Sequence, residues 1–229
     1  MAIIQNLHWA LSAEKRKIPM FESDETLDRP ILFMGGVHGD EPEGVALAEF
    51  LLEWLKSDSL NEKKTKVPWA VIPCLNPDGL VRGVRWNGNK VDLNRNYPSR
   101  DWEPSARAER YFPGPHPGSE SEIQTLCKWI EKNRPRLIVH FHSWVPCVVY
   151  AGEKARPAAE LLGRVSGYKV QDDIGYPTPG SLSQYAWGDH QIPVICTEEL
   201  SPTPRAAVWP RFKDALIKMV TEPTAVDLA

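Results

Sequence analysis

The chain has 229 residues, of which 42% are hydrophobic and 25% charged, and its formal net charge is −3. This composition is typical of a globular protein that buries a sizeable core. The small net charge gives no electrostatic basis for binding nucleic acid or an anionic membrane surface. No apolar run approaches the roughly 18 residues that suggest a membrane span. We therefore expect a small-molecule partner, and neither nucleic acid nor a membrane.

The N-terminus and the cysteines favour a cytoplasmic protein. Residues 1–21 have no basic segment ahead of the apolar ones, and Gln5, Asn6 and His8 interrupt the apolar run that a secretory signal requires. The cysteines form no CxxC pair, so free thiols are expected. There is no internal repeat or linker-like tract, and we expect a single domain over residues 1–229.

Apolar strands alternate with helices along the chain. Continuous apolar runs predict the strands, and apolar residues at i, i+3 and i+4 predict the helices. In chain order the predicted elements are a strand within 29–39, a helix over 42–57, a strand over 69–75, a turn at 76–80, a long irregular segment over 81–117, a helix over 119–133 with a capping box at Ser121 and Gln124, a strand over 136–144, a helix over 157–167, a strand over 191–200 and a helix over 206–220. The alternation predicts an α/β three-layer sandwich, with a mixed, mostly parallel central sheet flanked by helices.

Polar residues follow the predicted strands at their ends. His38, Asn76, His142 and Glu199 each come just past a strand. Open α/β sheets bind ligands at the carboxyl ends of their strands. We therefore expect these four side chains in one site.

The turn "GGVHGDEPEG" supplies two candidate metal ligands, His38 and Glu41. The strand "VHFHSW" offers His140 and His142 on one face, and His142 is the better ligand because it lies at the strand end. His140, deeper in the strand, is expected to support the core or a ligand. Two imidazoles and a carboxylate, with a fourth position left for water, are the ligand set of a catalytic zinc site. The simpler alternative for the turn is a hydrogen-bonded loop histidine beside an acid at a helix N-terminus.

The segment "GVRWNGNKVDLNRNYP" is rich in arginine and asparagine. Apolar Val91 and Leu93 are interleaved with these residues, which favours a partly buried loop over a solvated basic one. Guanidinium groups bind carboxylates through paired hydrogen bonds. A substrate with a free carboxylate is therefore expected.

Two adjacent acids, Glu198 and Glu199, end the strand "PVICTEEL". A carboxylate at this place could act as a general base towards a water whose pKa a metal lowers. Adjacent residues on a strand face opposite sides, so only one of the two can point into the site.

The motifs "HGDE", "NPDG", "VDLNRNYP", "HS" and "TEEL", in this order, resemble the zinc carboxypeptidase (M14 metallopeptidase) family. The resemblance covers about Gly35 to Leu200 and looks closest to the murein peptide amidase branch. Members of that branch hydrolyse the γ-D-glutamyl–meso-diaminopimelate bond of murein peptides. The resemblance thus implies zinc-dependent hydrolysis of an amide bond next to a free carboxylate, in a small peptide.

The resemblance also implies roles for individual residues. One Zn²⁺ per chain would be held by His38, Glu41 and His142, with Asp92 hydrogen-bonded to a zinc histidine. Asn94 and Arg95 would bind the substrate carboxylate, and Arg85 would polarise the scissile carbonyl. The general base would be Glu199, because the family pattern places glutamate directly before leucine, and Glu198 would be its outward neighbour. The substrate-capping tyrosine would be Tyr176, although its spacing from Gly180–Ser181 differs from that in the digestive enzymes.

Three alternatives remain open at this point. The first is an N-acyl amino-acid deacylase of the aspartoacylase or succinylglutamate desuccinylase type, which shares the HxxE motif and the Asn–Arg pair. The second is a conventional carboxypeptidase. The third is a binding module without catalysis, which the presence of every expected ligand and of a candidate base disfavours.

Overall fold

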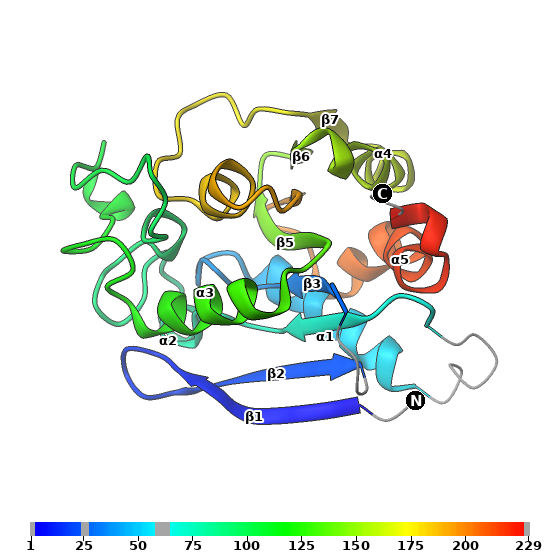
Figure 1. The fold of residues 1–229 in the computed structure, drawn as a ribbon, viewed down its shortest axis with the longest axis horizontal. Helices are drawn as coiled ribbons and strands as arrows, with labels where there is room; N and C mark the ends of the chain where they lie inside the picture. Colours follow the sequence, from blue (N-terminus) through cyan, green and yellow to red (C-terminus); the bar gives the residue numbers. More distant parts are fainter. Residues whose placement is uncertain (1–2, 24–27, 58–64, 227–229) are drawn as a thin grey trace.

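The computed structural model describes residues 3–23, 28–57 and 65–226. Within these ranges the strands are β1 (Ile3–Leu11), β2 (Lys17–Ser23), β3 (Ile31–Met34), β4 (Trp69–Ile72), β5 (Leu137–Trp144), β6 (Cys147–Ala151), β7 (Lys169–Gln171) and β8 (Val194–Leu200). They form one eight-stranded sheet in the order β1-β2-β4-β3-β5-β8-β6-β7. Figure 1 shows β1 and β2 as a long hairpin along one edge of this sheet.

The centre of the sheet is parallel and its margins are mixed. β3 pairs in parallel with β4 and β5, and β5 pairs in parallel with β8. β1, β2 and β4 are joined by antiparallel pairs, and β6 runs antiparallel to β8 but parallel to β7. The mixed, mostly parallel sheet predicted from the sequence is confirmed. The N-terminal hairpin was not predicted, because most of β1 is exposed and lacks an apolar run.

Helices cover both faces of the sheet. Their bounds are α1 (Pro42–Lys56), α2 (Pro77–Arg82), α3 (Ser121–Asn133), α4 (Arg156–Ser166) and α5 (Arg205–Thr221), with a π-helix over Gln184–Asp189. One core contains side chains from α1, α4 and α5, and α4 lies beside α5 (Figure 1). The other core contains side chains from α3 and the π-helix. The molecule is therefore a three-layer sandwich, as the alternation of elements indicated.

Strand periodicity divides side chains between the two cores. In β3, Ile31 and Phe33 belong to the core under α1 and α5, whereas Leu32 and Met34 belong to the core under α3. In β5, Val139 and Phe141 face the α1 side and Ile138 faces the α3 side. By the same alternation, His140 and His142 lie on the α3 side. The two histidines therefore emerge on one face, as the sequence predicted.

A glycine lets α1 approach β5 closely. A Cβ built on Gly44 would lie 2.2 Å from the backbone oxygen of Phe141, a distance that real Cβ atoms do not show. Gly44 is in the first turn of α1, just after the candidate ligand Glu41. The close contact thus holds the start of α1 against the strand that carries His142.

Two local predictions were wrong. The segment 76–80 is not a simple turn: Asn76 caps α2 by accepting a hydrogen bond from the backbone N–H of Gly79. The capping box at Ser121 and Gln124 does not form, because the Ser121 hydroxyl donates to the backbone oxygen of Leu11 instead. The partner of Asn76 is thus local, within its own helix, whereas that of Ser121 comes from a strand distant in sequence.

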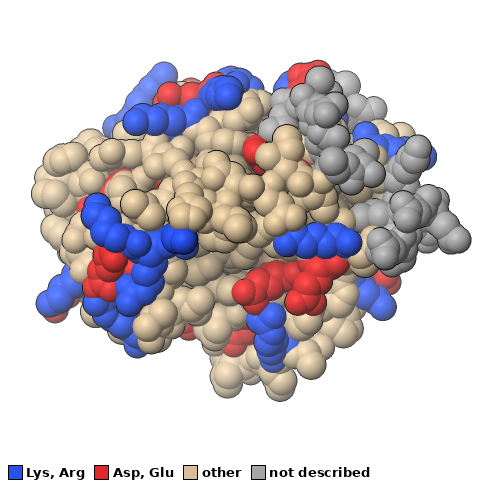
Figure 2. Space-filling model, turned by 90° about the horizontal axis from the view of Figure 1, so that it is seen from below, with Lys and Arg blue, Asp and Glu red and all other residues tan. Residues whose placement is uncertain are grey.

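The surface carries both signs of charge. On the face in Figure 2, which views the molecule from below, acidic groups lie beside basic ones within a largely uncharged surface. This mixture agrees with the small net charge of the chain. Among the described residues, the helices are too short or too polar to cross a membrane.

Candidate active site

Three candidate ligands converge beside the carboxyl end of β5. Nδ1 of His38 lies 2.8 Å from one carboxylate oxygen of Glu41, and Nδ1 of His142 lies 2.7 Å from the other. The two Nδ1 atoms are themselves 3.0 Å apart. All three side chains are buried. The turn after β3 and the end of β5 thus bring together residues about a hundred positions apart in sequence.

The donor set fits a zinc ion. One donor atom from each of the three residues lies within 4.8 Å of the others. Two nitrogens facing each other at 3.0 Å can have at most one proton between them, so hydrogen bonding alone satisfies the group poorly. Imidazole and carboxylate are ligands that zinc accepts. The residues present therefore match the ion that the sequence predicted.

Asp92 and Arg85 support this group from one side. Asp92 accepts a hydrogen bond from Arg85 Nε at 2.8 Å, and its other oxygen lies 3.2 Å from Nε2 of His38. Although burial opposes ionisation, the positive charge of Arg85 holds the pKa of Asp92 well below its usual range. Asp92 is therefore an anion that fixes the ring of His38, which is the contact predicted for it.

Arg85 also reaches the ligands themselves. Its Nη1 lies 3.2 Å from Nδ1 of His38 and 3.4 Å from an oxygen of Glu41. The guanidinium lines the pocket described below, so a substrate carbonyl bound near Glu41 would lie next to a fixed positive charge. This position is compatible with the role predicted for Arg85.

The placement of the adjacent acids differs from the prediction. Glu198 pairs with His142 in the parallel register of β5 and β8, and it lines the same pocket as His142. Burial, together with the nearby charge of Glu41, raises the pKa of Glu198 to about 8. Its Oε2 is buried without a hydrogen-bond partner. Glu198, which the sequence pattern made the outward neighbour, is the acid that faces the pocket.

Glu199 lies on the opposite face of β8. Its Oε1 accepts a hydrogen bond from the Tyr168 hydroxyl at 2.6 Å and pairs with Arg211 of α5. The physical reason is the strand alternation: Ile195 packs under α5, and Glu199, four positions later, points the same way. The assignment of Glu199 as the base is therefore wrong, because it cannot reach the pocket from this face.

The predicted carboxylate-binding pair lies on the pocket wall. Asn94 and Arg95 belong to a short 3₁₀ turn, Leu93–Arg95, and both line the pocket. The side-chain oxygen of Asn94 accepts a hydrogen bond from the backbone of Leu182, while Arg95 Nη1 contacts only the backbone oxygen of Asn94. The other donors of the Arg95 guanidinium are thus left for a ligand.

The pocket is a large cavity lined by both basic and acidic side chains. Its volume is about 1220 Å³. The lining includes the candidate ligands, Glu198, three tyrosines, the arginines Arg85, Arg95, Arg107 and Arg110, and the further acids Asp40, Glu153, Asp172 and Asp173. Arg110 is paired with Asp40, which also lines the pocket. A pocket of this size admits a small peptide, and its arginines are suited to bind a substrate carboxylate.

The chain matches the model of the zinc carboxypeptidase family over residues 4–222. The chain belongs to this family. Among curated relatives, murein peptide amidase A of Escherichia coli K12 is 34% identical over 165 residues, covering 67% of this chain and 64% of that protein's own length. Murein peptide amidase A of Vibrio campbellii is 30% identical over 200 residues, covering 82% of this chain and 76% of the relative.

Two solved structures share the fold. The crystal structure of murein-tripeptide amidase from Escherichia coli O157 superposes with a TM-score of 0.77 at 26% identity, covering 95% of this chain and 91% of the other. Thrombin-activatable fibrinolysis inhibitor superposes with a TM-score of 0.76 at 18% identity, covering 99% of this chain and 71% of the other. The fold of this zinc carboxypeptidase is thus the one that the sequence predicted.

Tyr176 lines the pocket, in a stack that sequence reasoning missed. The Arg107 guanidinium lies 4.2 Å from the ring centroid of Tyr176 and 4.2 Å from that of Tyr111. Tyr176 also meets Trp144 edge-on, with ring centroids 6.1 Å apart. Arg107 lies in the long irregular segment, where no periodic pattern marks its direction. The richness of that segment in arginine and aromatic residues was the only available signal.

Proposed function

We propose that the chain hydrolyses the γ-D-glutamyl–meso-diaminopimelate bond of murein peptides. The observation that supports hydrolysis best is the convergence of His38, Glu41 and His142 in the pocket that Glu198 also lines, with one buried oxygen of Glu198 lacking a hydrogen-bond partner. The choice of substrate is supported by the relatives named murein peptide amidase A and by the arginines that line the pocket.

The metal would be held by His38, Glu41 and His142. When bound there, zinc supplies a Lewis acid that polarises a carbonyl and lowers the pKa of water. Asp92 keeps the ring of His38 oriented with its Nδ1 towards Glu41. These ligands come from two rigid places in the fold, the glycine-flanked turn and the end of β5.

Glu198 takes the role of general base in this proposal. Its carboxylate accepts a proton from the attacking water and delivers that proton to the leaving amine. Arg85 stabilises the negative charge that develops on the carbonyl oxygen, a contribution typically worth about 3–4 kcal/mol. Asn94 and Arg95 hold the carboxylate next to the scissile bond and thereby set its position against Glu198.

A comparison of three substrate classes tests this proposal. The zinc-loaded enzyme is assayed with L-alanyl-γ-D-glutamyl-meso-diaminopimelate, with peptides ending in ordinary L-residues, and with N-succinyl and N-acetyl amino acids. We expect kcat/KM to be highest for the murein tripeptide. A preference for the second class would establish a conventional carboxypeptidase, and a preference for the third would establish a deacylase. Turnover of none of the three would favour a binding module.

A further inference from the structure

A second group of metal-ligating side chains lies next to the candidate zinc set and shares His142 with it. Nδ1 of His142 contacts Glu41 and His38, whereas its Nε2 lies 2.8 Å from Nδ1 of His140. The two nitrogens of this imidazole therefore face different neighbours on opposite edges of the ring. His142 connects the predicted zinc ligands to a deeper part of the pocket.

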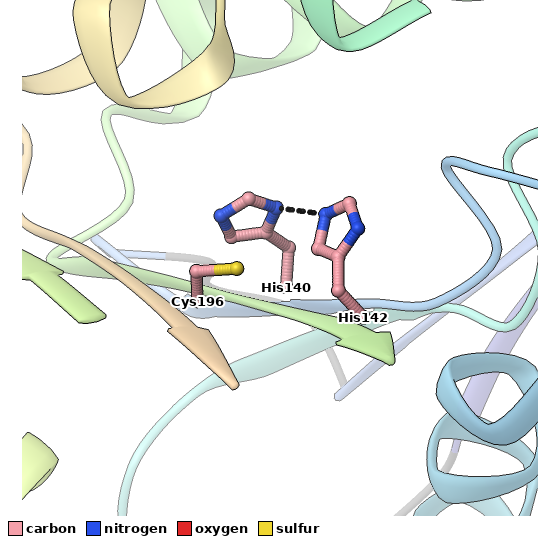
Figure 3. A group of neighbouring side chains, drawn as sticks. All are labelled: His140, His142 and Cys196. Atoms are coloured by element: carbon pink, nitrogen blue, oxygen red, sulfur yellow. Dashed lines mark hydrogen bonds between the residues drawn. The ribbon is translucent and has the colours of Figure 1, made fainter. Parts of the chain in front are cut away.

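Cys196 completes this second group. It pairs with His140 in the parallel register of β5 and β8, so the two side chains leave the sheet on one face. Cys196 Sγ and one nitrogen from each of His140 and His142 lie within 4.8 Å of one another. Figure 3 shows the sulfur directed towards the two rings. All three residues line the pocket, which gives an ion a path to them.

Hydrogen bonding leaves one nitrogen of this group without a partner, whereas Sγ of Cys196 donates to an oxygen of Glu198 at 3.5 Å. If Nδ1 of His142 carries a proton for Glu41, Nε2 of His142 accepts from Nδ1 of His140. If Nδ1 of His142 is free, the direction of that bond reverses. In both arrangements Nε2 of His140 has no partner, and this atom is buried and unpaired. Burial of an imidazole with one unsatisfied nitrogen is unfavourable, and ligation of a metal by the ring would compensate for it.

We propose that His140, His142 and Cys196 form a second metal site, which takes a divalent ion with affinity for both imidazole and thiolate, such as Zn²⁺ or Cd²⁺. Two nitrogens and one thiolate are a ligand combination that zinc accepts, and a thiolate favours such ions over Mg²⁺ or Ca²⁺. Binding converts the thiol of Cys196 to a thiolate and releases its proton to solvent.

The two sites can be filled together through His142. An ion at the second site is held by Nε2 of His142, while Nδ1 stays directed at Glu41 and His38. If both ions are bound, each would take one nitrogen of His142, and the remaining ring proton would be released to solvent. The second site therefore adds an ion and does not displace the first.

A cobalt titration of the metal-free full-length chain tests this site. Co²⁺ bound to a thiolate gives a ligand-to-metal charge-transfer absorption in the near ultraviolet, which imidazole and carboxylate ligands do not give. We expect the wild type to bind two equivalents of Co²⁺ and to develop this absorption. Cys196→Ala should bind one equivalent and lose the absorption. The matched control is Cys127→Ala, since Cys127 lies in α3 and does not line the pocket.

A further variant, His140→Ala, should also lose the second equivalent while keeping the first. The proposal is overturned if the wild type binds a single equivalent without the charge-transfer absorption. It is equally overturned if that absorption persists in Cys196→Ala. The readout is stoichiometry and absorption, so its outcome is independent of which amide bond the enzyme hydrolyses.

Discussion

At the scale of single residues, the neighbouring acids of β8 have separate environments. Glu198 lines the pocket beside the candidate ligands, whereas Glu199 is hydrogen-bonded to Tyr168 and paired with Arg211 beneath α5. Adjacent residues on a strand point to opposite faces. Glu198 is therefore a candidate base, whereas Glu199 contacts side chains that hold β8 against α5.

Paired substitutions test these roles. Glu198→Gln should retain its fold and the first metal equivalent but lose turnover about 10²–10⁴-fold, because the general base is removed. Glu199→Gln should retain turnover in the folded enzyme but lose about 1–3 kcal/mol of unfolding free energy, since its charged hydrogen bonds weaken. Steady-state kinetics and denaturant unfolding measure both effects. The reverse pattern, with turnover lost only in Glu199→Gln, would contradict the assignment.

The raised pKa of Glu198 predicts a pH-dependent stability of the metal-free protein. The pKa rises from an ordinary 4.5 to about 8 on folding, so the contribution of this carboxyl to stability is present at low pH and is lost as pH rises towards 8. The loss is up to about 1.4 kcal/mol for each pH unit in this window. Glu198→Gln should gain stability relative to wild type between pH 5 and 8, and the gain should level off above. Unfolding curves in EDTA measure it; an equal difference at every pH would contradict the shift.

At the scale of elements, close backbone contacts fix the loops that carry the site. Gly180 has a positive φ of 70°, and a Cβ at this position would lie 2.2 Å from the backbone oxygen of Arg95. The backbone of Tyr97 donates a hydrogen bond to the oxygen of Gly180 at 2.9 Å. The loop before the π-helix is thus packed directly on the turn that presents Asn94 and Arg95.

Substitution of this glycine should disturb substrate binding. Gly180→Ala forces the loop away from the turn of Arg95, so we expect KM for the tripeptide to rise more than kcat falls. Gly167→Ala is the matched control, because Gly167 also has a positive φ but has no atom near the position of its Cβ. Both variants introduce backbone strain at a positive φ, but only Gly180→Ala disturbs the contact with Arg95. Comparing their kinetics therefore isolates the effect of that contact. A similar rise of KM in both would exclude a role for the contact.

At the scale of the whole molecule, the predicted metal links separate parts of the fold. His38 and Glu41 follow β3, whereas His142 ends β5, so a bound ion stabilises only the folded chain. An ion present at about a thousand times its dissociation constant adds about 4 kcal/mol. We expect chelation with EDTA to lower the unfolding midpoint and Zn²⁺ to restore it. His38→Ala should show a smaller response, since the group of His140, His142 and Cys196 remains; an equal response in the wild type and in His38→Ala would argue against metal binding at this site.

The sequence by itself determined the layers and the candidate ligands of the site. Apolar runs indicated β3, β4, β5 and β8, and spaced apolar residues indicated the helices, because burial on one or both faces imposes these periodicities. The positions of His38, Glu41 and His142 at strand ends followed from the same reasoning. The local sequence pattern was sufficient to place a residue wherever its position depends only on the helix, strand or turn to which it belongs.

Only the tertiary structure decided which way β8 faces. Most residues of β8 are buried whichever face of the strand they lie on. The alternation of side chains alone therefore does not tell which of the two faces lies on the pocket side of the sheet. The register with β5, which sets His142 beside Glu198 and His140 beside Cys196, selects one of them. The same register creates the His140, His142 and Cys196 group, whose members lie on two strands and have no recognisable spacing. Contacts between strands distant in sequence are fixed by packing of the whole sheet, and no local pattern contains them.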